Sequence, residues 1–98
     1  DPEKGVLLLT TACNLGSAEG CNELGVAHAS GLGLSPDAAR AAELFERACD
    51  LGSMTACANL ALATRRGEGV DRNEDRALEL LRRACAGGHE QSCAALGQ

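Results

Sequence analysis

Residues 49–57 read Cys49-Asp50-Leu51-Gly52-Ser53-Met54-Thr55-Ala56-Cys57, with a cysteine at each end and a Gly-Ser pair near the middle. The same spacing of eight residues recurs in two further cysteine pairs, and successive pairs lie about 36 residues apart: Cys13 with Cys21, and Cys85 with Cys93. Aligning residues 13–48 on residues 49–84 gives about 15 identities, and a regular period of this length is the signature of stacked supersecondary units. The sequence therefore predicts a repeat protein.

The amino-acid composition favours helices. The chain of 98 residues contains 18 alanines and 15 leucines but only three valines, no isoleucine and a single aromatic residue, Phe45. Strands favour β-branched and aromatic side chains, whereas Ala and Leu have high helix propensity. The fold is therefore predicted to be all-α.

Glycines and capping residues divide the first complete copy into two helices. Ser17 is expected to cap a helix over residues 18–30, which ends at the loop Gly31-Leu32-Gly33. Ser35 is expected to cap the next helix, with Pro36 at the first helical position, where its missing N–H costs nothing.

The following boundaries repeat this pattern. The second helix is expected to run to about Leu51, where Gly52 supplies the positive φ of a helix C-terminus. Ser53 and Asn73 are the expected caps of the next two helices, and Gly87-Gly88 closes the copy. The pattern predicts five helices and part of a sixth.

The predicted repeat array occupies residues 1–98. It divides into the second helix of a partial repeat (1–16), two complete repeats (17–52 and 53–88) and the start of a further repeat (89–98). Leu7 stands where the complete copies have Glu43 and Glu79, which suggests a face meant for a preceding helix. We therefore expect a segment of a longer solenoid; the alternative is a short protein whose open ends are covered by self-association or by a partner.

Several stretches together resemble a known family. They are Leu24-Gly25, Gly31-Leu32-Gly33-Leu34, residues 41–49 and Gly52, and they are similar to the Sel1-like repeat, a helical hairpin of the tetratricopeptide type. The period and the cysteine spacing resemble the cysteine-rich subgroup typified by the Helicobacter cysteine-rich proteins. The resemblance covers essentially the whole chain. It implies a right-handed solenoid of stacked antiparallel helical hairpins.

The resemblance also implies a disulfide within each cysteine pair, across the short turn between one helix and the next. Independently, the expected helices place Cys49 in a last turn and Cys57 in the following first turn, where the Cα atoms can approach within the roughly 4.4–6.8 Å that a disulfide requires. Two alternatives remain open from the residues alone. One is free buried cysteine in a cytosolic protein, and the other is metal binding, although the C-x₂₋₄-C spacing is absent and His28 and His89 are the only histidines.

Several classes of function are disfavoured. A net charge of −5 with a single aromatic residue argues against nucleic acid, and no apolar run approaches the roughly 20 residues of a membrane span. No metal is predicted, and no cofactor is predicted either. The glycine pairs that superficially resemble phosphate loops recur with the repeat, so they are interpreted as turns. Lys4 is the only lysine and no serine precedes a lysine by three residues, so no catalytic residue is assigned.

Binding in stacked helical hairpins usually takes place on the concave surface, which the first helix of each repeat lines. The tetratricopeptide pattern places these groove-facing residues at Asn22, Val26 and Ala29, at Ala58, Leu62 and Arg65, and at Ala94 and Gln98. Arg66 is added because Arg is enriched at interface hot spots and binds carboxylates through two hydrogen bonds. The alternative for both arginines is a solvated helix end, where they favour the negative end of the helix dipole.

The sequence thus predicts a scaffold that binds a protein or peptide partner and is not an enzyme. The cysteines and the resemblance place it in the bacterial periplasm or outside the cell, with the mitochondrial intermembrane space as the alternative. Two other functions remain as alternatives: binding or hydrolysis of β-lactams or cell-wall peptides, a label that some proteins of the subgroup carry, and a structural spacer in a larger protein.

Overall fold

Six helices form the chain, and a computed structural model describes them over residues 2–31 and 35–97. They are α1 (Pro2–Asn14), α2 (Ala18–Ser30), α3 (Ala38–Asp50), α4 (Met54–Arg66), α5 (Glu74–Ala86) and α6 (Glu90–Ala95). The predicted all-α fold, with five full helices and part of a sixth, is confirmed.

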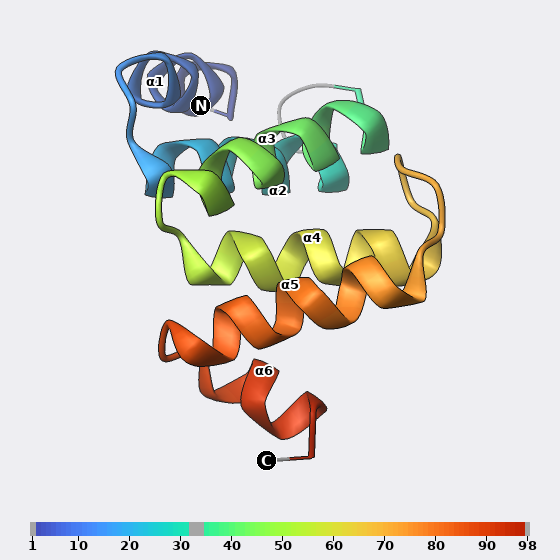
Figure 1. Cartoon of the computed structure of the whole chain (residues 1–98). Coiled ribbons are helices and arrows are strands. Elements are labelled where there is room, and N and C mark those ends of the chain that lie inside the picture. The colour runs from blue at the N-terminus through green and yellow to red at the C-terminus, as the bar shows by residue number, and fades with distance from the viewer. Residues whose placement is uncertain (1, 32–34, 98) are drawn as a thin grey trace.

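The helices stack in one direction. α2 pairs with α3 and α4 pairs with α5 as antiparallel hairpins, while α1 and α6 lie at opposite ends of the stack (Figure 1). The stack is elongated, with principal extents of 40 × 24 × 17 Å. Each added hairpin therefore extends the molecule along one axis, as expected of a repeat protein.

Short polar side chains begin the helices, mostly where the sequence predicts. The hydroxyl oxygens of Ser17 and Ser53 accept hydrogen bonds from the backbone N–H groups of Gly20 and Ala56, over 2.9 and 3.1 Å. Asn73 Oδ1 accepts in the same way from the N–H of Arg76 over 3.0 Å. Each cap satisfies a backbone donor that the first turn leaves unpaired.

The prediction that Ser35 caps α3 is wrong. Asp37 is the cap, with Oδ1 accepting from the N–H of Arg40 over 3.0 Å, and Pro36 lies before the helix. The N–H of Asp37 donates to the carbonyl of His28 over 2.8 Å, which holds Asp37 in an extended conformation (φ −146°). This bond to the preceding helix fixes where α3 begins.

The helix ends follow the expected glycines where the structure describes them. Gly31, Gly52 and Gly88 all have positive φ, between 76° and 107°. Leu32, Gly33 and Leu34 lie outside the described residues, so the loop predicted there is seen only in its second copy. There Gly69 lies so close to the backbone of Ala38 that a Cβ would collide with the Ala38 carbonyl, which makes this glycine a packing residue between hairpins.

The core consists of small and medium apolar side chains on the facing surfaces of the helices. Its larger members are Leu24, Leu44, Phe45, Leu60, Leu80 and Leu81, with alanines and cysteines between them. Gly25 of α2 has no side chain where the ring of Phe45 from α3 lies, and a Cβ at Gly25 would be 2.7 Å from Phe45 Cε1. In the next hairpin, Ala61 takes the place of Gly25 and Leu81 takes the place of Phe45. The helix position that gains a Cβ thus faces a smaller side chain.

We predict that Gly25→Ala destabilises the protein, although Ala normally stabilises a helix relative to Gly by about 1 kcal/mol. The added Cβ overpacks against Phe45, at an expected cost of about 1–3 kcal/mol in the free energy of unfolding. The double variant Gly25→Ala/Phe45→Leu reproduces the pairing of the next hairpin and should recover most of the loss. Urea unfolding of the wild type and the two variants measures this, and an unchanged or raised midpoint for Gly25→Ala would contradict the packing argument.

Candidate functional site

The candidate site is a groove between α2 and α4, the first helices of the two complete hairpins. One hollow of this groove has a volume of about 320 Å³. Nine residues line it: Val26, Ala29 and Ser30 of α2, Phe45 of α3, Asn59, Leu62, Ala63 and Arg66 of α4, and Glu68 beyond it. We call this space the apolar hollow.

Two aliphatic side chains border the apolar hollow and remain in contact with solvent. Val26 is 46% exposed and Leu62 is 45% exposed, although both lie on helices whose other apolar residues are largely buried. Phe45 is buried and contributes to the wall. The hollow therefore offers apolar surface from three helices to an approaching side chain.

The two arginines at the end of α4 have different surroundings. Arg66 borders the apolar hollow and lies 3.9 Å from Glu68, an exposed and weak ion pair. Arg65 does not border it; its Nε donates to Glu74 Oε1 over 3.1 Å. Arg66 is thus the arginine that is available to a ligand in this hollow, while Arg65 links α4 to α5.

A second hollow of about 470 Å³ continues the groove toward the N-terminal ends of α2 and α4. It is lined by Ala18, Glu19, Asn22 and Glu23 of α2 and by Ser53, Met54 and Thr55 at the start of α4. We call it the acidic hollow, because its charged residues are two glutamates. Between the two hollows, Asn59 Nδ2 donates to Asn22 Oδ1 over 3.0 Å and joins the helices.

The structure brings four of the predicted groove residues together. Val26, Ala29, Leu62 and Arg66 border the apolar hollow. Asn22 borders the acidic hollow, and Ala58 borders, with Leu62, a smaller space of about 180 Å³ toward α6. Ala94 is exposed on α6, and Gln98 lies outside the described residues.

Sequence reasoning missed Glu19, Glu23, Phe45 and Asn59 as groove residues. Asn59 could have been found from its place beside Ala58, one residue from a predicted groove position. Glu19 and Glu23 carry a signal too, because they lie four residues apart on one helix face, on either side of Asn22.

The predicted disulfides hold the elements that form the groove. Cys13–Cys21, Cys49–Cys57 and Cys85–Cys93 are all formed, with Cα separations of 4.5, 4.7 and 4.7 Å. They join α1 to α2, α3 to α4 and α5 to α6. Because all six cysteines are in disulfides, the alternatives of free thiols and of cysteine metal ligands are excluded.

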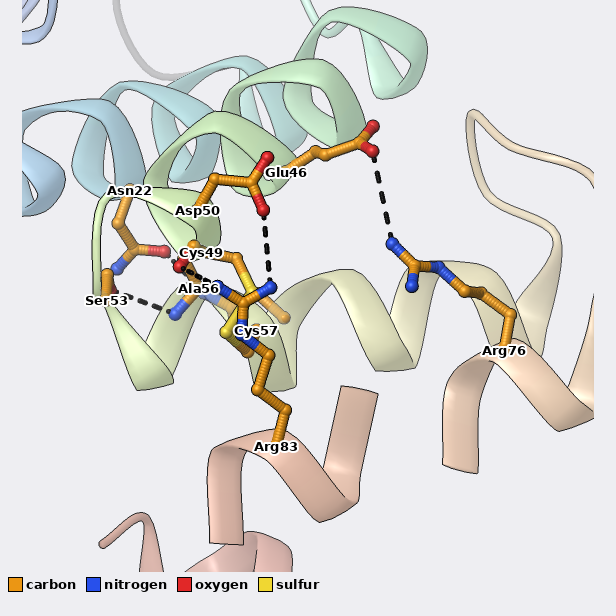
Figure 2. The surroundings of a disulfide bond; sticks show 10 residues. Asn22, Glu46, Cys49, Asp50, Ser53, Ala56, Cys57, Arg76 and Arg83 are labelled. Carbon is orange, nitrogen blue, oxygen red and sulfur yellow. Dashed lines mark hydrogen bonds and ion pairs between the residues drawn. A yellow bond between two sulfur atoms is a disulfide. The ribbon is translucent and has the colours of Figure 1, made fainter. Parts of the chain in front are cut away.

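Two arginines of α5 make polar contacts with α3, and one of them, Arg83, lies beside the central disulfide (Figure 2). Arg83 Nη2 donates to the carbonyl of Cys49 over 3.0 Å, and its Nη1 lies 3.3 Å from Asp50 Oδ1. Arg76 Nη2 lies 4.0 Å from Glu46 Oε1. These contacts tie α5 to α3 across the hairpin boundary. The Cys49 carbonyl at the end of α3 also accepts from the N–H of Gly52 over 3.0 Å, so Arg83 adds a second hydrogen bond to it.

Residues 2–31 and 35–97 contain no group of three His, Cys, Asp or Glu residues that could hold a metal ion. None of the helices in this described part is long and apolar enough to cross a membrane. His89 is the cap of α6: its Nδ1 accepts from the backbone N–H of Ser92 over 3.3 Å and lies 2.8 Å from Ser92 Oγ.

The fold and the disulfides define a helical-hairpin repeat protein. Residues 1–17, 18–53 and 55–89 match the family described as Sel1 repeat, and the chain belongs to this family. Solved structures similar to this chain include those of three bacterial proteins. Helicobacter pylori cysteine rich protein B is 32% identical with a TM-score of 0.94, and the match covers 97% of this chain and 71% of that one.

Two further similar structures belong to longer proteins. A protective antigen of uropathogenic Escherichia coli displaying an SLR fold is 28% identical with a TM-score of 0.94, over 99% of this chain and 21% of that one. A Sel1 repeat protein from Oxalobacter formigenes is 25% identical with a TM-score of 0.92, over 97% of this chain and 38% of that one. No curated protein matches the sequence.

We predict that the double variant Cys49→Ala/Cys57→Ala loses about 2.5 kcal/mol of unfolding free energy, since the disulfide closes a short loop in the unfolded chain. Urea unfolding under oxidising conditions measures the loss. The double variant Cys85→Ala/Cys93→Ala removes another disulfide with the same sequence separation of eight residues, and its unfolding free energy serves as the comparison. A midpoint for the Cys49 variant equal to that of the unreduced wild type would contradict a stabilising role.

Proposed function

We propose that this chain is a binding scaffold that receives a segment of a protein partner in the groove between α2 and α4. The observation that carries the proposal is the pair of half-exposed side chains, Val26 and Leu62, on either side of a hollow walled by Phe45. Apolar surface gathered around a concavity is typical of a site for a partner's side chain. The membership in a family of helical repeats supports the same role.

The expected strength of this contact is modest. Full burial of a Val or Leu side chain contributes about 1.5–3 kcal/mol, and each of these two is already about half buried, so covering both contributes about 2 kcal/mol. A millimolar complex already requires about 4 kcal/mol. We therefore expect the apolar hollow to act as an anchor point within a longer contact, with Arg66 at its edge.

We also propose a periplasmic or secreted location. Its support is the set of three disulfides, which persist in oxidising compartments and are rare in the cytosol.

We predict that Leu62→Gln weakens peptide binding at least about tenfold, because a polar amide then borders the apolar hollow. The probes are peptides selected from a random display library on the oxidised chain, with affinities measured by fluorescence polarisation. Leu51→Gln is the control, since Leu51 is also 45% exposed but lies outside the groove at the end of α3. Equal losses for the two variants, or no selected peptide, would overturn the proposal.

Hydrolysis of β-lactams is the alternative to test, because His89 Nδ1 lies 2.8 Å from Ser92 Oγ, a spacing that an activated serine would also show. We propose that this pair only caps α6, since Ser92 is 2% exposed and its N–H also faces His89.

The expected result is no turnover of a chromogenic cephalosporin by the purified chain above the buffer rate. Turnover that accompanies the folded chain and disappears in Ser92→Ala would refute the capping role and restore the enzymatic alternative.

A further inference from the structure

We propose that the groove selects an extended peptide segment that carries a Lys or Arg two or three residues away from an apolar side chain. The apolar side chain enters the apolar hollow, and the cation lies against Glu19 and Glu23 in the acidic hollow. This inference rests on the proposed function and adds the chemistry of the partner.

The first support is charge. Glu19 and Glu23 are exposed, they lie one helical turn apart on α2, and neither has an ion-pair partner within the described part of the chain. No Lys or Arg lines the acidic hollow. By contrast, Glu43, Glu46, Glu74 and Glu79 all pair with arginines. This end of the groove therefore attracts a cation.

The second support is the amide bridge between the two hollows. Asn59 Nδ2 donates to Asn22 Oδ1. The side-chain donor of Asn22, Nδ2, and the side-chain acceptor of Asn59, Oδ1, are therefore left for a ligand. A donor and an acceptor side by side match the N–H and C=O groups that an extended peptide presents. Both asparagines are only partly buried, so a backbone lying in the groove can reach them.

The third support is the spacing. Along α2, Val26 is three residues from Glu23 and seven from Glu19. At a rise of 1.5 Å per residue, these separations along the helix axis are about 4.5 and 10.5 Å. An extended peptide advances about 3.3 Å per residue. A side chain in the apolar hollow and a cation between the two glutamates are therefore two or three peptide residues apart.

Charge also separates this partner from an acidic one. An acidic segment would be repelled by Glu19 and Glu23, and at the other end of the groove Glu68 offsets Arg66. A segment with one apolar and one basic side chain occupies both hollows and places no negative charge opposite Glu19 or Glu23.

The test uses the oxidised chain and random twelve-residue display peptides. Glu19→Gln/Glu23→Gln removes two charges from the groove. The matched control, Asp75→Asn/Glu79→Gln, removes two charges from the second and sixth positions of α5, the same helix positions as Glu19 and Glu23 in α2. Neither control residue borders either hollow.

We expect selected peptides to share a basic residue two or three positions from an aliphatic or aromatic one. Their affinity should fall about fivefold to tenfold in the Glu19/Glu23 variant at low ionic strength, less at high salt, and not in the control.

Peptides that share only an apolar residue, bind equally well to the Glu19/Glu23 variant and are lost with Leu62→Gln would overturn this inference and leave the proposed function intact. Peptides that bind Leu62→Gln as well as the wild type would overturn both.

Discussion

A disulfide between the end of one helix and the start of the next holds successive hairpins of this chain together. Apolar packing joins the two helices of each hairpin, but a core of alanines and leucines in 98 residues offers limited burial. Residues 51–53 form the turn between α3 and α4, and the disulfide Cys49–Cys57 cross-links the two helices beside that turn. It therefore joins the two complete hairpins. Arg83 adds a second connection at the same place by binding the Cys49 carbonyl.

The groove is a consequence of this stacking. Parallel placement of α2 and α4 brings Asn22 beside Asn59 and leaves hollows on both sides of that bridge. The repeat also explains why the two ends of the groove differ chemically. Equivalent positions of successive hairpins carry different residues, such as Val26 and Leu62 or Glu23 and Asn59, so one scaffold presents apolar and acidic surface in one line.

Much of the fold could be predicted from short-range patterns. The cap at Asn73, the positive φ at Gly52 and the pairing of cysteines eight residues apart all depend on groups within one or two helical turns. The start of α3 could not be predicted in the same way, because the bond from Asp37 to the His28 carbonyl competes with the local capping signal of Ser35-Pro36. The equivalence of Asp37 with Asn73 in the repeat was the signal that pointed to the correct cap.

The helices, the period and the cysteine pairs can be predicted from the sequence, because they follow from helix propensity, residue spacing and local hydrogen bonds. Which polar groups border the groove depends instead on how the hairpins pack in three dimensions. Arg65 pairs with Glu74 whereas Arg66 borders the apolar hollow, and Asn22 finds a partner 37 residues away. These outcomes depend on how the hairpins are rotated against one another, and that rotation is set by the contacts of many buried side chains together.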